Sequence, residues 1–374
     1  MHSRHSAPTP RLPALLAILG GVLLAACSSQ STTIGRSAPN AEAAKTQAET
    51  FATYATPNGW GNYGEQFTTF CQAKFGFDCN RAERSQAEDI LSAEEIQKFD
   101  AEKNNPGAVL ADVGILFIPQ AEKVNVLADY EAPNANLLPD NLHGPGWVAT
   151  FVGVPAFLVN VDFLEDHGLP IPRTWQDLLN PGYAHMVGLS RVGVSGSGTY
   201  GFVAMNLAAG GTLEDFQPGI DYARELVPNL TNQMTVETFE RGEVPISIRY
   251  DFQHGANFQA LTDRGIRYEL IVPSDGSLFG ESTLMMNRYD VAHADFGKMF
   301  FEWVLTDEAQ IIFAKFGARP IRSVVGDNRL VVPEEARVNW LPDEAYANVR
   351  SIDFRQVDPS AIVDIWENEV ASGG

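Results

Sequence analysis

Basic residues are scarce in this chain. Of its 374 residues, 26 are lysine or arginine and 47 are aspartate or glutamate, giving a formal net charge of −21 at pH 7. A protein that binds nucleic acid needs a basic face to neutralise phosphates, and the sequence contains no basic run. We therefore exclude nucleic acid as a partner. Binding to an anionic membrane surface is disfavoured for the same reason.

The motifs of common catalytic and metal sites are also missing. The histidines are scattered, without a metal-ligand spacing such as H-E-x-x-H. The stretch Gly193–Ser197 lacks the last glycine of the G-x-S-x-G elbow found in hydrolases. The sequence predicts no catalytic residue, no metal ion and no cofactor. With 45% hydrophobic and 20% charged residues, it predicts a globular protein of about two domains.

The beginning of the chain predicts export. In the first 26 residues, two arginines precede an apolar stretch from Leu12 to Ala26 that is too short to span a bilayer. This pattern is typical of a secretory signal peptide. Its end resembles a bacterial lipobox, in which Cys27 becomes the lipid-modified N-terminus. The alternative is an ordinary cleavage site beside a chance cysteine. Residues 27–45 then form a flexible tether to the cell envelope.

Cysteine is rare, with three residues in all. Apart from Cys27, only Cys71 and Cys79 remain, in a compartment that permits oxidation. They are close in sequence, and Gly76 between them allows a reversal of the chain. A local disulfide is therefore expected, and two free buried thiols are the alternative.

The order of predicted elements indicates an α/β fold. Thr50–Ala55 is expected to be a strand, Gly64–Lys74 a helix and Val109–Ile115 a buried strand. Between them, Ser92 and Glu95 form a capping-box pattern at the start of another helix. In such sheets, ligands bind beyond the carboxyl ends of the strands.

A glycine- and serine-rich junction separates a strand at Met186–Ser190 from a helix predicted over Thr199–Ala209. It contains a G-x-G-x-x-G spacing, but its position in the middle of an exported chain argues against dinucleotide binding. Unpaired N–H groups at a helix start still favour an oxyanion. The alternative is a helix capped by its own Ser197 or Thr199. The candidate anion-binding residues are Ser195, Ser197, Gly198 and Thr199.

Two further groups of candidates follow from strand and turn patterns. Val244–Phe252 alternates as a strand, with Arg249 and Asp251 on the face opposite Tyr250. Either these charges pair with each other, or they point into a cleft where they bind a ligand. Trp60 and Tyr63 lie near the turn after the first strand. Either they provide apolar walls for a ligand, or they belong to the ordinary packing of the core. The candidates from these patterns are Trp60, Tyr63, Arg249, Tyr250 and Asp251.

Six segments and three later residues carry a joint resemblance to a known family. They are Pro57–Glu65, Ala101–Pro106, Pro172–Pro181, Ser197–Thr199, Arg241–Ile246 and Asp307–Gln310, followed by Gly317, Pro320 and Arg322. Together they resemble bacterial ABC-importer solute-binding proteins over roughly residues 50 to 325. The resemblance implies an α/β, two-lobed periplasmic-binding-protein type II (Venus-flytrap) fold with two crossover strands. It also implies a monomer without enzymatic activity, which delivers a solute to an ABC permease in the cytoplasmic membrane.

The resemblance places the lobe boundaries by analogy. Lobe one is expected to comprise residues 46–150 and 280–374, and lobe two residues 151–279. The crossovers are expected near residues 147–154 and 268–282. The ligand is expected in the cleft between the lobes, which close by a hinge motion.

The expected ligand is a small anionic or zwitterionic solute that carries a phosphate, phosphonate or carboxylate. Its anion would lie at the helix start and any ammonium near Asp251. A polyamine, held by Asp251 and Trp60, is the first alternative. Ferric iron is less favoured, because its binders in this class present adjacent tyrosines and this chain has none. A secreted α/β hydrolase and a structural lipoprotein without a ligand are more distant alternatives.

Overall fold

A computed structural model describes residues 32–86, 90–231, 238, 243–253, 261–326 and 329–371. The predicted signal peptide over residues 1–26, the predicted lipid-anchor residue Cys27 and the beginning of the segment Arg241–Ile246 lie outside the described residues. Within the described part, no helix combines the length and apolar character needed to cross a membrane.

The first sheet combines parallel and antiparallel strands in the order β13-β5-β12-β3-β1-β2, with β4 paired to β5. The buried strand predicted over Val109–Ile115 is β3, which runs parallel to β1 and antiparallel to β12. The strands are β1 (Thr53–Tyr54), β2 (Ser85–Gln86), β3 (Leu110–Gly114), β4 (His143–Gly144), β5 (Trp147–Gly153), β12 (Gly280–Met286) and β13 (Arg319–Pro320).

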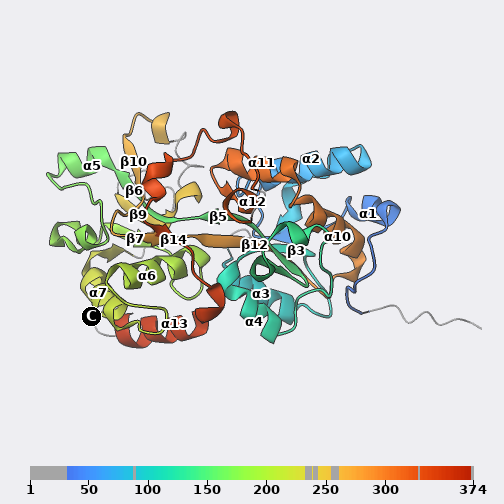
Figure 1. Cartoon of the computed structure of the whole chain (residues 1–374), viewed down its shortest axis with the longest axis horizontal. Coiled ribbons are helices and arrows are strands. Elements are labelled where there is room, and N and C mark those ends of the chain that lie inside the picture. Colours follow the sequence, from blue (N-terminus) through green and yellow to red (C-terminus); the bar gives the residue numbers. More distant parts are fainter. Residues whose placement is uncertain are drawn as a thin grey trace, which may run out of the picture. The chain divides into compact units, whose positions relative to one another are not determined.

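A second sheet has the order β10-β6-β9-β7-β8, and a small ribbon joins β11 to β14. The chain leaves the first sheet after β5 and enters the second at β6, then returns between β10 and β12 (Figure 1). The strands are β6 (Pro155–Asn160), β7 (Val187–Leu189), β8 (Leu230–Thr231), β9 (Ile246–Tyr250), β10 (Tyr268–Ile271), β11 (Ser277–Leu278) and β14 (Val349–Arg350).

Helices pack on both sheets. An aromatic cluster joins α2 to α10, in which the ring centroids of Phe67 and Phe300 are 4.1 Å apart. The α-helices among the described residues are α1 (Ala41–Gln47), α2 (Tyr63–Phe75), α3 (Ser92–Ala101), α4 (Ile118–Lys123), α5 (Val161–Asp166), α6 (Gly196–Ala208), α7 (Gln217–Leu226), α10 (Ala294–Trp303), α11 (Asp307–Phe316), α12 (Ile321–Val324) and α13 (Pro359–Ile365).

The segment expected to be a tether packs against the folded body from residue 32 onward. Ile34 is 3% exposed, and its N–H donates to the carbonyl of Arg288 at 2.7 Å. Asn40 then caps α1, because its side chain accepts from two N–H groups of the first turn. The prediction of a flexible tether over residues 27–45 is therefore wrong for residues 32–45, where an apolar anchor and a capped helix hold the chain.

The C-terminal segment contacts the helices of the second sheet. The ring of Trp366 meets that of Phe202 in α6 edge-on, with centroids 5.5 Å apart. The Nε–H of Arg224 in α7 donates to the carbonyl of Glu369 at 2.6 Å. In Figure 1, α13 accordingly lies beside α6 and α7. The expected assignment of all of residues 280–374 to lobe one does not describe this last segment.

Cys71 and Cys79 form a disulfide between the end of α2 and the following loop, with their Cα atoms 5.8 Å apart. Both cysteines are buried. We expect the double variant Cys71→Ala/Cys79→Ala to lose about 2–3 kcal/mol of unfolding free energy, because the unfolded chain regains the entropy of the closed loop. Urea unfolding of the variant and the oxidised protein measures this difference. Equal midpoints would contradict the prediction.

Candidate functional site

A cavity of about 490 Å³ lies between the two sheets. Ala55 follows β1 and Gly114 ends β3, so the first sheet contributes two carboxyl strand ends. Leu189 ends β7 and Tyr250 ends β9 in the second sheet. This placement agrees with the ligand position expected for α/β sheets, beyond the carboxyl ends of their strands.

The start of α6 forms one wall of the cavity, three residues earlier than the sequence predicted. Ser195 is the N-cap, and its Oγ accepts from the N–H of Gly198 at 3.4 Å. The N–H of Thr199 donates to the carbonyl of Ser195 at 3.0 Å. Self-capping therefore occupies these two N–H groups. Those of Gly196 and Ser197 donate to no other described residue, and both residues line the cavity.

Arg249 and Tyr250 line the same cavity from β9. The Nε of Arg249 and the Oη of Tyr250 are buried without a hydrogen-bond partner among the described residues. A Cβ at Gly196 would lie 3.5 Å from this Oη, so the hydroxyl is beside the helix start. Burial lowers the pKa of Arg249. Buried polar groups are nearly always paired in native proteins. The Arg249 Nε and the Tyr250 Oη therefore favour a polar ligand in this cavity.

Of the residues predicted from the sequence, Trp60, Ser195, Ser197, Arg249 and Tyr250 line the cavity. The other four, Tyr63, Gly198, Thr199 and Asp251, do not line it.

Tyr63, Gly198 and Thr199 stand behind the cavity wall. Tyr63 is fully buried, and its hydroxyl donates to Asp112 at 2.7 Å. A Cβ at Gly198 would come within 2.4 Å of the carbonyl oxygen of Ser190, so this glycine lets the helix pack on β7. The hydroxyl of Thr199 donates to the carbonyl of Ser195 at 2.7 Å. These residues support the wall from behind.

Asp251 links the first crossover, where the chain passes from β5 to β6, to the segment that contains Tyr346. Its Oδ1 accepts from the N–H groups of Val154 and Phe252, both at 2.9 Å. Its Oδ2 accepts from the hydroxyl of Tyr346 at 2.7 Å. The expected partner of a ligand ammonium is therefore fully occupied within the protein. It also forms no ion pair with Arg249 among the described contacts.

Three carboxylates that sequence reasoning missed line the cavity instead. Glu95 comes from α3, Asp112 from β3 and Glu281 from β12, and they are 1%, 6% and 8% exposed. Burial raises the pKa of Asp112 to about 6 and that of Glu281 to about 7. Burial and the nearby Asp112 raise the pKa of Glu95 well above its usual range. Such perturbed groups cluster at functional sites.

The predicted capping box at Ser92 and Glu95 is wrong. The cap of α3 is instead made by Glu94, whose carboxylate accepts from the N–H of Leu91 at 2.9 Å. The Oγ of Ser92 accepts from the N–H of Gly114 at 3.0 Å, which ties α3 to the end of β3. This arrangement leaves Glu95 free to face the cavity.

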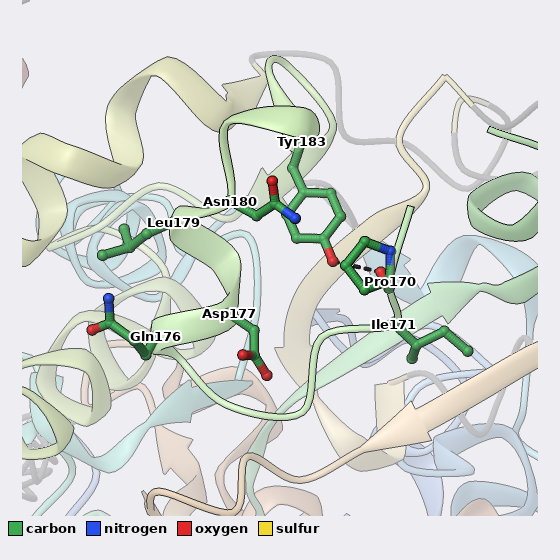
Figure 2. A pocket seen from close by; sticks show the side chains of 7 residues that line it. All are labelled: Pro170, Ile171, Gln176, Asp177, Leu179, Asn180 and Tyr183. Atoms are coloured by element: carbon green, nitrogen blue, oxygen red, sulfur yellow. Dashed lines mark hydrogen bonds between the residues drawn. The ribbon is translucent and has the colours of Figure 1, made fainter. Parts of the chain in front are cut away.

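A second hollow, of about 390 Å³, lies beside the segment that follows α5. Figure 2 shows that Tyr183 reaches across it to Pro170, to whose carbonyl its hydroxyl donates at 2.5 Å. The carboxylate of Asp177 accepts from the N–H groups of Arg173 and Thr174. Asp177 and Tyr183, which line this hollow, are thus hydrogen-bonded to nearby backbone groups. We therefore take the cavity between the sheets as the candidate functional site.

Comparison with known proteins assigns the class. Residues 110–349 match the family of bacterial extracellular solute-binding proteins. The chain belongs to this family. A search of curated protein sequences gives no match.

Solved structures of periplasmic binding proteins have the same fold. AfuA from Actinobacillus pleuropneumoniae, with fructose-6-phosphate bound, has a TM-score of 0.66 at 18% identity, covering 86% of this chain and 98% of its own. The ferric binding protein from Campylobacter jejuni has a TM-score of 0.61 at 16% identity, covering 86% and 99%. The Atu4243-GABA receptor has a TM-score of 0.61 at 12% identity, covering 86% and 97%. These similarities confirm the predicted two-lobed fold class.

Among the described residues, no group of three or more His, Cys, Asp and Glu side chains is arranged to hold a metal ion. By its family, the chain is an ABC-type solute-binding protein. Its cavity offers hydroxyls, two arginines, N–H groups and carboxylates. This set of groups can bind both a negatively charged and a positively charged group of one organic ligand.

Proposed function

We propose that this protein captures a small zwitterion for an ABC importer. The anionic group of the ligand, a carboxylate, phosphonate or phosphate, lies at the start of α6 and accepts from Gly196, Ser197 and Arg249. The ammonium lies toward the three carboxylates of the opposite wall. Trp60 provides an apolar contact for the ligand's carbon chain.

The unpartnered Arg249 carries this proposal. Its Nε is buried and unsatisfied among the described residues, although three carboxylates line the same cavity. An anion that accepts from the guanidinium would satisfy it, and charge-assisted hydrogen bonds of this kind are strong. The helix dipole of α6 favours negative charge at the same place.

A polyamine is the second candidate. The carboxylates of Glu95, Asp112 and Glu281 outnumber the cationic side chains of the cavity, which are Arg191 and Arg249. Arg191 is already paired with Glu94 at 2.8 Å. A ligand with several ammonium groups would compensate the carboxylates, but it would leave Arg249 without an anion.

The remaining parts of the proposal follow from the family and from the beginning of the sequence. The protein is exported and anchored at the cell envelope through a lipid on Cys27. It acts as a monomer, has no catalytic activity of its own, and delivers its ligand to a permease in the cytoplasmic membrane. Metabolic labelling with a radioactive fatty acid, with Cys27→Ala as the control, tests the anchor.

Thermal shift with a ligand panel tests the ligand class. The panel contains 4-aminobutyrate, 2-aminoethylphosphonate, fructose-6-phosphate, spermidine and ferric citrate. A ligand present at 100 times its Kd adds about 2.7 kcal/mol of stability. We expect the two zwitterions to raise Tm most. Butyrate, which lacks the ammonium, is added as a control and should raise Tm less than 4-aminobutyrate. A response to spermidine alone would favour the polyamine, and a response to ferric citrate alone would favour iron.

The two walls of the cavity approach each other through glycines. A Cβ at Gly114 would lie 3.3 Å from the Cα of Gly196, closer than most real contacts. We expect Gly114→Val to weaken binding of the best panel ligand by about tenfold or more, because overpacking costs about 1–3 kcal/mol. Isothermal titration calorimetry measures the change. Gly35→Val is the control, since no atom lies within 4 Å of its Cβ. Equal affinities of the two variants would refute the prediction.

A further inference from the structure

The carboxylates of the cavity are buried without a cation. Asp112 accepts from the hydroxyls of Tyr63 and Ser282. Glu281 accepts from the hydroxyl of Tyr200 at 2.9 Å. The Oε2 of Glu95 is buried and has no partner among the described residues. None of the three carboxylates forms an ion pair within the described part of the chain.

The carboxylate cluster consists of Glu95, Asp112 and Glu281. The groups next to it are neutral or acidic, apart from Arg84, whose charge acts on Tyr63. Tyr63 faces it from α2, Tyr200 from α6 and Tyr250 from β9, and Glu94 adds a further negative charge near Glu95. The cationic side chains that line the cavity are Arg191, which is paired with Glu94, and Arg249 from β9. Burial and mutual repulsion both disfavour full ionisation of such a cluster, so the empty site retains protons near neutral pH.

We propose that binding of the ligand's ammonium group releases protons from the cluster formed by Glu95, Asp112 and Glu281. This inference rests on the proposed function. In the empty site, at least one of these groups is a neutral carboxylic acid. When the ammonium enters, that acid gives its proton to solvent, and the resulting carboxylate pairs with the ammonium. One positive charge enters and one leaves, so the buried charge of the site stays balanced.

Two consequences follow from linkage. Each proton released makes affinity rise about tenfold per pH unit, so we expect binding to strengthen from pH 6 to pH 8. In the ligand-free protein, the raised pKa values mean that the folded state holds more protons than the unfolded chain between about pH 4 and 7. Its Tm should therefore rise as the pH falls from 8 to 5.5.

The main experiment is calorimetry at pH 7 with 4-aminobutyrate and 3-aminopropanesulfonate, whose own groups do not titrate near neutral pH. Titrations in Bis-Tris and in Tris, two buffers that bring no phosphate to the anion site, separate the heat of binding from the heat of buffer protonation. We expect release of about one proton per ligand. Glu281→Gln, which cannot release a proton, should show less release and a weaker pH dependence of affinity. Glu65→Gln, on the surface of α2, should behave like the parent protein.

The outcomes separate the two proposals. Binding of either probe with no proton release, and with equal affinity at pH 6 and pH 8, would overturn the coupling and leave the proposed function intact. Failure of both probes to bind, although spermidine binds, would overturn the zwitterion proposal itself. A ligand-free Tm that falls between pH 8 and pH 5.5, in parent and Glu281→Gln alike, would also contradict the retained protons.

Discussion

Replacing Arg249 by methionine is expected to weaken ligand binding by about thirtyfold or more while it raises the stability of the ligand-free protein. Removing one partner of a buried charge pair costs about 2–5 kcal/mol of binding free energy, and Arg249 is the proposed partner of the ligand anion. In the empty protein the same guanidinium is buried without a described partner. Methionine removes the cost of burying this charge. Apolar replacements of buried ion pairs raise the unfolding free energy by up to about 4 kcal/mol.

Arg191 offers a matched control because it lines the same cavity. Its side chain is 64% exposed and is paired with Glu94. Exposed pairs contribute about 0–1 kcal/mol, so Arg191→Met should change affinity by less than about tenfold. Calorimetry with 4-aminobutyrate and thermal unfolding without ligand give both readouts. If Arg249→Met binds as tightly as Arg191→Met, the anion does not contact Arg249.

The sequence predicted the part of the site that local patterns define. A strand, a glycine- and serine-rich turn and a helix place Ser195 and Ser197 at a helix start, whatever the tertiary structure is. Alternation along the predicted strand Val244–Phe252 predicted a ligand contact for Arg249, which does line the cavity, but β9 ends at Tyr250 and Asp251 lies beyond it. The exact start of α6 was missed, because a serine N-cap at Ser195 is as compatible with the pattern as one further along.

The three cavity carboxylates were missed although they left a signal. Asp112 stands inside a nearly continuous apolar strand, and Glu281 lies at the beginning of an equally buried one. Acidic residues are rarely buried without a partner or a function. Their meeting with Glu95 depends on the pairing of β3 with β12 and on the packing of α3, which no local pattern specifies.

Asp251 shows the opposite error. As an acid at a strand end it suggested a ligand contact, yet its three acceptor interactions are made to Val154, Phe252 and Tyr346. Phe252 is the neighbouring residue, whereas Val154 comes from the first crossover and Tyr346 lies 95 residues further along the chain. Alternation along one strand gives the face of a residue, but it cannot show which distant segment covers that face.

Asp251→Ala should therefore destabilise the protein strongly without removing a ligand contact. It leaves two buried N–H groups and the Tyr346 hydroxyl without their acceptor, and each unsatisfied group costs about 1–3 kcal/mol. We expect a loss of about 3–6 kcal/mol in urea unfolding. Affinity for 4-aminobutyrate, measured by calorimetry at a temperature where the variant is folded, should change little.

Asp251→Asn is the informative partner of this variant. Asparagine keeps the carbonyl oxygen that accepts from Val154 and Phe252, and its amide N–H can donate to the Tyr346 oxygen. Because burial raises the pKa of Asp251, a neutral side chain also avoids the cost of burying the charge. Asp251→Asn should thus retain most of the stability that Asp251→Ala loses. If instead both variants stay stable but lose affinity alike, Asp251 binds the ligand and does not hold the crossover.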